Sequence, residues 1–177
     1  IHFKWGLLNP KAGNVQISYE KTRHEYKDAY LFKMIFKTAG VAEKVYKTRD
    51  TLTNIYSADH ILLKAAKYTN EKDRYNIDET TFSYRDNKTY ARMHRYNLER
   101  TKVDTTYVAE GCVLDMLSSV FFIRNLDWDK LQLNDSFAAS VVSGRSMVKT
   151  IIRYKGQRIL NISETIKYNT HYFSIDV

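Results

Sequence analysis

The cysteine and histidine side chains of this chain could carry nucleophilic or metal chemistry, but their spacing predicts neither. Cys112, the only cysteine, directly precedes an expected helix, whose N-terminus can lower a thiol pKa. No histidine or asparagine lies close to it in sequence, so we expect a buried structural thiol. The five histidines follow no metal-ligand spacing, so we expect neither a metal nor a cofactor. They are His2, His24, His60, His94 and His171.

Carboxylate pairs at Asp78/Glu79 and Asp127/Asp129 have the residue types needed for glycoside hydrolysis. Such enzymes usually bring two acids together across a cleft, whereas these acids are close in sequence. Residues 127–130 are typical of a loop that follows a helix. The chain also lacks a Gly-x-Ser-x-Gly elbow and a glycine-rich phosphate loop. We therefore expect no catalytic residues, and an enzyme is only the third hypothesis.

A stripe of basic and aromatic residues covers Tyr90, Arg92, His94 and Tyr96, with Arg95 beside it. On an exposed sheet such a stripe can stack bases or sugars and neutralise anionic groups. The other interpretation is a mixed outer sheet face, where tyrosine and arginine are common. We favour the outer face and expect no nucleic-acid partner. An anionic glycan or another polymer remains the alternative partner.

Composition indicates one ordered domain that carries excess positive charge. The 177 residues include 28 Lys and Arg against 20 Asp and Glu, which gives a net charge of +8. No stretch approaches the ~18 apolar residues of a membrane-crossing helix, so we expect no transmembrane segment. Basic chains attract anionic partners. Here the cations recur singly, which is typical of a solvated sheet surface.

The elements that must position these residues are mostly strands, because apolar and polar residues alternate along much of the chain. In the clearest case, Tyr30, Phe32, Met34 and Phe36 share one face of a strand. A turn at Asn9–Gly13 follows the first expected strand. The expected strands are 2–8, 15–20, 30–36, 50–57, 61–70, 76–85, 89–97, 102–108, 136–143, 147–154, 157–162 and 170–177.

Two segments depart from this alternation and predict helices. Residues from about 40 to 47 form a short one, and residues from about 113 to 125 form a longer one. The longer segment is apolar nearly all round, so we expect it to be buried. Many strands joined by short turns, with one buried helix, predict a curved antiparallel sheet that forms a barrel or half-barrel. A two-sheet sandwich is the alternative.

Three segments together resemble a known family. They are Lys11-Ala12-Gly13, Val45-Tyr46-Lys47-Thr48-Arg49-Asp50, and Leu114-Asp115-Met116-Leu117-Ser118-Ser119 continuing to Phe121-Phe122-Ile123-Arg124. Their order and spacing resemble the exported bacterial family called domain of unknown function 3108, along nearly the whole chain. Members usually have proline where this chain has Met116. We interpret Gly13 as a turn residue, Asp115 as a helix cap, and Arg49 and Asp50 as ion-pairing residues.

The resemblance implies a secreted or periplasmic protein of a Gram-negative envelope, with curved antiparallel architecture and no established activity. It also implies a further C-terminal hairpin after residues 172–177, which this sequence does not include. Because the chain begins with Ile1 inside an expected strand, we infer that an N-terminal segment, plausibly a signal peptide, precedes it.

Our leading functional prediction is non-enzymatic binding of a lipid, an acyl chain or a protein segment. The aromatic and methionine side chains of one strand face, beside a very apolar helix, favour a concave apolar groove. We expect this ligand groove to be lined by Tyr30, Phe32, Met34, Phe36, Leu117 and Phe121.

Overall fold

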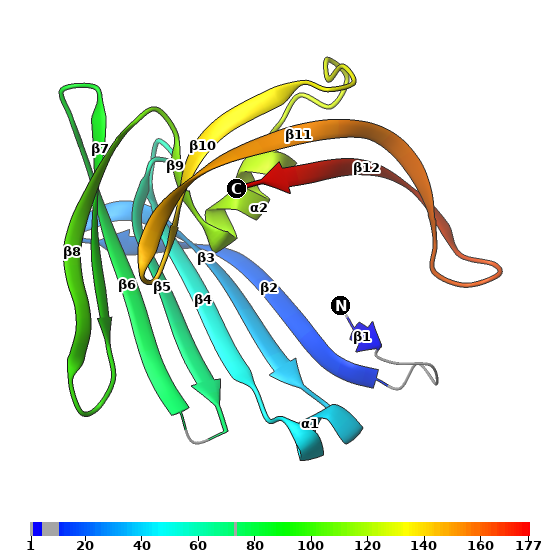
Figure 1. Cartoon of the computed structure of the whole chain (residues 1–177), viewed down its shortest axis with the longest axis horizontal. Coiled ribbons are helices and arrows are strands. Elements are labelled where there is room, and N and C mark those ends of the chain that lie inside the picture. Colours follow the sequence, from blue (N-terminus) through cyan, green and yellow to red (C-terminus); the bar gives the residue numbers. More distant parts are fainter. Residues whose placement is uncertain (1, 5–10, 73) are drawn as a thin grey trace. The chain divides into compact units, whose positions relative to one another are not determined.

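The computed structural model describes residues 2–4, 11–72 and 74–177 of the chain, and most of them lie in strands (Figure 1). They form two compact units, Ile1–Val108 and Ala109–Val177. Each unit has its own sheet and is described separately below. The expectation of a single domain stays a prediction.

The first unit contains an eight-stranded sheet in which the strands follow one another in sequence order. Every neighbouring pair from β1 to β7 is antiparallel, which confirms the mostly antiparallel β class. The strands are β1 (His2–Lys4), β2 (Lys11–His24), β3 (Lys27–Thr38), β4 (Arg49–Ser57), β5 (Leu62–Glu71), β6 (Arg74–Arg85), β7 (Lys88–Tyr96) and β8 (Thr101–Glu110).

This sheet does not close. Among the described residues the strand order runs from β1 to β8, and no pairing joins those two edges. A closed barrel requires such a pairing, because its strands have no free edge. A closed barrel is therefore not found in the described part of the chain. The expected turn at Asn9–Gly13 lies partly outside the described residues, and its last three residues belong to β2.

Two tight hairpin turns fix the register of the first sheet. Glu25 and Tyr26 connect β2 to β3, and Asp86 and Asn87 connect β6 to β7. All four residues have positive φ angles, as two-residue hairpin loops of type I′ require. Register matters because a slip of one residue would move every side chain of a strand to the opposite face.

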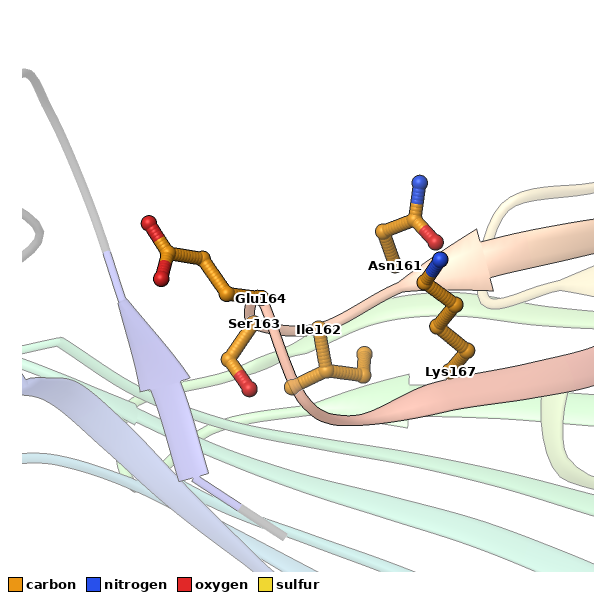
Figure 2. A pocket seen from close by; sticks show the side chains of 5 residues that line it. All are labelled: Asn161, Ile162, Ser163, Glu164 and Lys167. Carbon is orange, nitrogen blue, oxygen red and sulfur yellow. The ribbon is translucent and has the colours of Figure 1, made fainter.

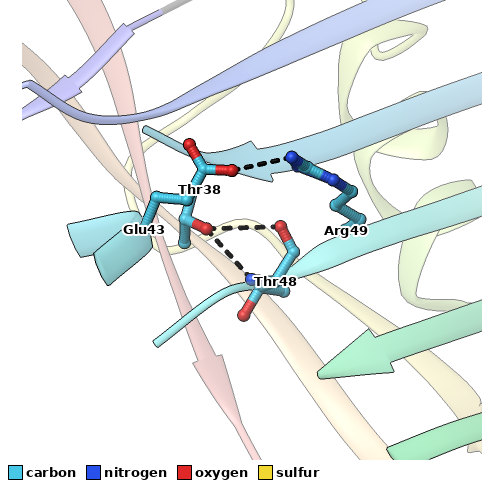
Figure 3. Close-up of polar contacts among 4 residues, drawn as sticks. All are labelled: Thr38, Glu43, Thr48 and Arg49. Carbon is cyan, nitrogen blue, oxygen red and sulfur yellow. Dashed lines mark hydrogen bonds and ion pairs between the residues drawn. The ribbon is translucent and has the colours of Figure 1, made fainter. Parts of the chain in front are cut away.

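The short helix α1 (Val41–Val45) connects β3 to β4 and has no buried residue. Arg49 Nη2 donates a hydrogen bond of 2.7 Å to Glu43 Oε1, which ties α1 to the start of β4 (Figure 3). Thr48 N donates to Thr38 Oγ1 at 3.0 Å beside it. These polar contacts connect α1 and its flanking strands, and the helix is shorter than the expected 40–47.

The second unit contains a four-stranded sheet in the order β12-β11-β10-β9. Its strands are β9 (Val113–Asp115), β10 (Ser136–Ser143), β11 (Ser146–Asn161) and β12 (Lys167–Asp176). The β9–β10 pair is parallel, while the other two pairs are antiparallel. The expected strands 147–154 and 157–162 are one strand, β11. Its register shifts between Tyr154 and Gln157, where Gly156 has a positive φ angle.

Helix α2 (Met116–Arg124) starts three residues later than expected. Residues 113–115 pair with β10 instead, and Asp115 then caps the helix. Only Leu117 and Ser118 of α2 are buried, while Met116 and Val120 are exposed, so the expectation of a buried helix is met on one side only. Neither described helix has the length and apolarity needed to cross a membrane.

One side of α2 packs against the second sheet. Phe122 and Ile123 contact a core of Leu114, Ala139 and Ile152, which belong to β9, β10 and β11. Burial of this apolar surface is the main favourable contribution to the free energy of packing a helix on a sheet. The core of the second unit therefore depends on both the parallel β9–β10 pair and the antiparallel β10–β11 pair.

Candidate functional site

Strand β4 places polar residues at buried positions of the first sheet. Its alternate residues Asp50, Leu52, Asn54 and Tyr56 are all buried. Residues two apart on a strand share a face, so two polar side chains lie among apolar ones. Sequence analysis named Asp50 as an ion-pairing residue but did not foresee that Asp50 and Asn54 are buried, although the period-2 pattern through Leu52 and Tyr56 already placed them on that face.

Pairing extends this face across the sheet. One residue from each of the strands β3 to β7 lies opposite the next across the sheet. In that order they are Phe32, Asn54, Ala65, Thr80 and Met93. Directly opposed residues share a face, and all five are buried. We call the face that carries this row the apolar face of the first sheet. At its centre Asn54 is fully buried, and its Nδ2 donates a hydrogen bond of 3.4 Å to Tyr56 Oη.

The four groove residues expected on β3 lie together on this apolar face. Tyr30 is opposite Tyr56, Met34 is opposite Leu52, and Phe36 is opposite Asp50. Phe32 is buried, whereas the other three are only half-buried. Their neighbours on β2, Ile17 and Tyr19, are 45% and 44% exposed. The apolar face is therefore buried along β4–β7 and accessible along β2–β3.

An aromatic cluster occupies one end of the accessible part. The Tyr19 and Tyr30 rings stack with centroids 5.3 Å apart, and the Tyr30 ring stacks on His60 at 5.0 Å. The hydroxyl of Tyr19 lies 3.2 Å from His60 Nδ1, within hydrogen-bond distance. Partial burial, with Tyr30 beside it, raises the pKa of Tyr19. The cluster thus offers flat apolar surface beside a hydroxyl that can form hydrogen bonds.

A row of alternating charges forms the other end of the apolar face. Lys67 on β5 lies between Leu52 on β4 and Asp78 on β6. Asp78 in turn lies opposite Arg95 on β7. Lys67 Nζ lies 3.9 Å from Asp50 Oδ2, and Arg95 Nε lies 3.3 Å from Asp78 Oδ1. We call these four residues the charge row. Its two cations balance its two carboxylates, as buried charges require.

Asp50 is the member of the charge row whose pKa is clearly shifted. Burial raises the pKa of its carboxyl group, and this effect outweighs the hydrogen bond from Asn70 N and the nearby Lys67 ammonium, which lower it. The Asn70 N to Asp50 Oδ1 distance is 3.2 Å. Burial disfavours the charged form of this carboxyl group, and the one nearby cation compensates only part of that cost. Such carboxylates occur in binding sites as well as in structural networks.

The remaining expected groove residues, Leu117 and Phe121, belong to α2 in the second unit. Leu117 is buried and Phe121 is half-buried. The loop that follows α2 carries Trp128. The Trp128 ring lies 4.5 Å from the His171 ring, and Tyr154 Oη lies 3.0 Å from His171 Nδ1. A groove that combines these α2 residues with β3 stays a prediction.

The basic aromatic stripe is split between the two faces of the first sheet. Tyr90, Arg92, His94 and Tyr96 lie on the face opposite the apolar one, whereas Arg95 lies on the apolar face with Met93. The expected cluster of five therefore does not form. Strand alternation alone separates Arg95 from its sequence neighbours.

Carboxylates offset the cations on the sheet face that carries Tyr90, Arg92, His94 and Tyr96. Arg92 Nε lies 3.4 Å from Asp104 Oδ1, and Lys64 Nζ lies 2.7 Å from Glu79 Oε1. The hydrogen bond to Glu79 is the largest cause of the raised pKa of Lys64. Tyr96 Oη donates to the other Glu79 oxygen at 3.3 Å, and its ring stacks on His94. This face is a mixed, neutralised surface, in line with the interpretation favoured above.

Comparison with family models decides the affiliation of the chain. The model of the family described as Protein of unknown function (DUF3108) matches residues 1–177, the whole length. The chain belongs to this family. Comparison with curated proteins and with solved structures gives no match.

The segments that carry the resemblance to DUF3108 have structural roles in this member. Gly13 lies inside β2 rather than in a turn, and a side chain there would meet the Lys37 carbonyl oxygen and the Phe36 ring. Arg49 pairs with Glu43, and Asp50 belongs to the charge row. Asp115 accepts hydrogen bonds from Leu117 N and Ser118 N, which confirms it as the cap of α2.

Cys112 of the DUF3108 chain is exposed, so the expectation of a buried thiol was wrong. It precedes β9 rather than the helix, which moves it away from the helix N-terminus. Desolvation of the sulfur nevertheless raises the pKa of its thiol. A neutral thiol is a poor nucleophile, so Cys112 has neither the position nor the protonation state of a catalytic cysteine.

Metal and acid–base chemistry find little support in the described part of this DUF3108 chain. Within residues 2–4, 11–72 and 74–177, no three His, Cys, Asp or Glu side chains form a group that could hold a metal ion. Asp78 and Glu79 point to opposite faces of β6, and Asp127 pairs with Lys130 at 2.6 Å. Asp78 and Glu79 therefore do not face one another across a cleft, as the two acids of glycoside hydrolases do.

An open cavity of about 460 Å³ lies at the tip of the β11–β12 hairpin (Figure 2). It is lined by Asn161, Ile162, Ser163, Glu164 and Lys167. Its lining has one aliphatic side chain among polar and charged ones, without the apolar walls typical of small-molecule sites. We therefore place the candidate binding site on the apolar face of the first sheet.

Proposed function

We propose that this DUF3108 member is an exported cell-envelope protein that binds a lipid, an acyl chain or an apolar protein segment on the apolar face of the first sheet. The proposed role is non-enzymatic. Export to the periplasm or another part of a Gram-negative envelope is proposed from the family resemblance. The ligand site is proposed from the side chains of β2 and β3.

The observation that carries the proposal is the accessible, continuous apolar surface along β2 and β3. Single exposed apolar side chains are normal on proteins, but a contiguous patch indicates an interaction site. Ile17, Tyr19, Tyr30, Met34 and Phe36 form such a patch beside the buried row through Phe32. Methionine and aromatic side chains adapt to ligands of varied shape, which suits acyl chains.

The charge row supports an amphipathic ligand rather than a purely apolar one. The Lys67 side chain is 34% exposed, and its ammonium lies 3.9 Å from Asp50, longer than a close ion pair. Met34 is opposite Leu52, and Leu52 is opposite Lys67. A chain lying along Met34 would therefore bring an anionic head group toward Lys67.

The shape of the site is part of the same proposal. We infer that the first sheet forms a half-barrel whose apolar face is concave. Twisted antiparallel sheets with one apolar face commonly bend around that face. Figure 1 shows the long strands of both sheets as bent ribbons, which supports curvature within each unit.

The test is native mass spectrometry of the full-length mature protein, purified from cells and then extracted under denaturing conditions. We expect a reproducible added mass that extraction releases as an acyl-containing molecule. A protein that remains at its bare mass, even after incubation with excess fatty acid and phospholipid, contradicts the proposal.

The alternative, binding of an anionic polymer, has weaker support. Arg92 pairs with Asp104, and Arg95 faces the other side of the sheet beside Asp78. Charge reversal at Arg92 is therefore expected to leave retention on an acidic polymer nearly unchanged. A large, salt-sensitive loss of retention would favour the polymer instead.

A further inference from the structure

The outer part of the β11–β12 hairpin, residues 157–172, has one apolar face that is exposed. Leu160 lies opposite Tyr168, and Arg158 lies opposite Thr170. Ile162 N donates a backbone hydrogen bond of 2.9 Å to Ile166 O, so these two residues oppose each other at the tip. Alternation places the apolar members on one side. We call this side the hairpin's apolar face. It carries Leu160, Ile162, Ile166, Tyr168 and Tyr172, all exposed, together with Arg158 and Thr170.

The opposite face of the same hairpin is polar. Asn161 lies opposite Lys167, and Gln157 lies opposite His171. The ends of the Asn161 and Lys167 side chains lie near one another in Figure 2. Ile159 is the one aliphatic residue of this face within residues 157–171, all of which the structure describes. The hairpin is therefore amphipathic, and the separation of its faces follows from strand alternation.

One cation, Arg158, lies on the apolar face itself. The Arg158 guanidinium lies over the Tyr172 ring at 4.2 Å from its centroid. Between residues 155 and 172 there are three cations, Lys155, Arg158 and Lys167, and one carboxylate, Glu164. Aliphatic side chains flanked by tyrosine and arginine are typical of surfaces that meet the interface of an anionic bilayer.

We propose that the hairpin's apolar face docks on an anionic lipid surface, with the hairpin lying flat and its polar face toward water. Five half-exposed side chains offer on the order of 500 Å², which is below the ~800 Å² per partner of a standard protein interface. A second copy of the chain is therefore a poorer occupant. A lipid surface needs no shape match, and its negative charge complements Arg158, which lies on the docking side. This docking does not depend on the ligand proposed for the first sheet.

Co-sedimentation with vesicles tests the docking. The full chain is mixed with vesicles of phosphatidylcholine containing phosphatidylglycerol, and with phosphatidylcholine alone. We expect binding to the anionic vesicles, and about a tenfold weaker binding constant for Ile162→Ser because an aliphatic contact with lipid is lost. Ile159→Ser is the matched control, since Ile159 and Ile162 are 63% and 60% exposed on opposite faces. It should change binding less than about twofold.

Several results would overturn the docking. The first is that wild type binds neither kind of vesicle. The second is that Ile162→Ser and Ile159→Ser weaken vesicle binding equally. The third is that wild type is a dimer in sedimentation velocity and that Ile162→Ser dissociates it. If Ile162→Ser fails to fold, judged by its thermal unfolding, Arg158→Glu replaces it and should weaken binding to the anionic vesicles alone. Unchanged binding of Arg158→Glu at low salt would then contradict the proposal.

Discussion

The Phe36 ring lies directly against Gly13 of the neighbouring strand. A Cβ atom at Gly13 would be 3.3 Å from Phe36 Cε2 and 2.8 Å from the Lys37 carbonyl oxygen. Phe36 belongs to the accessible part of the apolar face, so the absence of a side chain at Gly13 sets the position of a proposed ligand-binding ring. The backbone oxygen cannot move away without disturbing the β2–β3 pairing.

Gly13→Ala is therefore expected to lower the free energy of unfolding by about 1–3 kcal/mol, because the added methyl overpacks a tight contact. Urea denaturation measures the change. Gln16→Ala, at an exposed position of the same strand, is the control and should stay within about 0.5 kcal/mol of wild type. A Gly13→Ala variant as stable as the control would show that the contact is not tight.

Asp78→Ala is expected to destabilise the first unit by about 3–5 kcal/mol, because it leaves the Arg95 guanidinium uncompensated on a largely buried face. The double variant Asp78→Leu/Arg95→Met should recover most of this loss. Asp104→Ala removes the partner of Arg92, whose ion pair is exposed, and should cost no more than ~1 kcal/mol. Denaturant midpoints of these variants check the charge row, and equal costs for the two aspartates would argue against it.

Asp50 gives a pH dependence with a definite sign. Its pKa is raised in the folded chain from 3.8, so folding favours the protonated carboxyl. The resulting stability is present below pH 3.8 and is lost as pH rises through the raised folded value. The unfolding free energy of wild type minus that of Asp50→Asn should therefore be larger at pH 4 than at pH 7. Urea titrations across this window measure it, and a difference that grows toward pH 7 would reverse the assignment.

Cys112 should react slowly with thiol reagents although it is exposed. Its raised pKa leaves little thiolate at pH 8, and the thiolate is the nucleophile. The rate of modification by a disulfide reagent should fall below that of a free cysteine peptide and rise steeply with pH. Faster modification than the peptide at pH 8 would point instead to an activated thiol.

Strand alternation predicted part of the fold correctly. It placed Tyr30, Phe32, Met34 and Phe36 on one face, and pairing with β4 confirms that they share it. The gap between the expected strands 76–85 and 89–97 also coincides with the tight turn at Asp86-Asn87, where both residues have positive φ angles.

Other features depended on long-range pairing that a local pattern does not contain. Residues 113–115 fit a helical repeat, yet they form β9 because β10, about 25 residues away, pairs with them. The charge row was missed because Asp50, Lys67, Asp78 and Arg95 come from four strands whose register no local pattern shows. Arg95 was grouped with Arg92 by proximity in sequence, although alternation puts them on opposite faces.

The most direct test of the central claim is a binding titration with a fluorescent fatty acid, using Met34→Lys and Ile35→Lys. Both side chains are half-buried on β3, but Met34 lies on the apolar face and Ile35 on the opposite one. We predict that Met34→Lys weakens binding by at least about tenfold, because it places an ammonium in an apolar contact, while Ile35→Lys binds like wild type. Equal affinity of Met34→Lys and wild type, with both folded, would contradict ligand binding on this face.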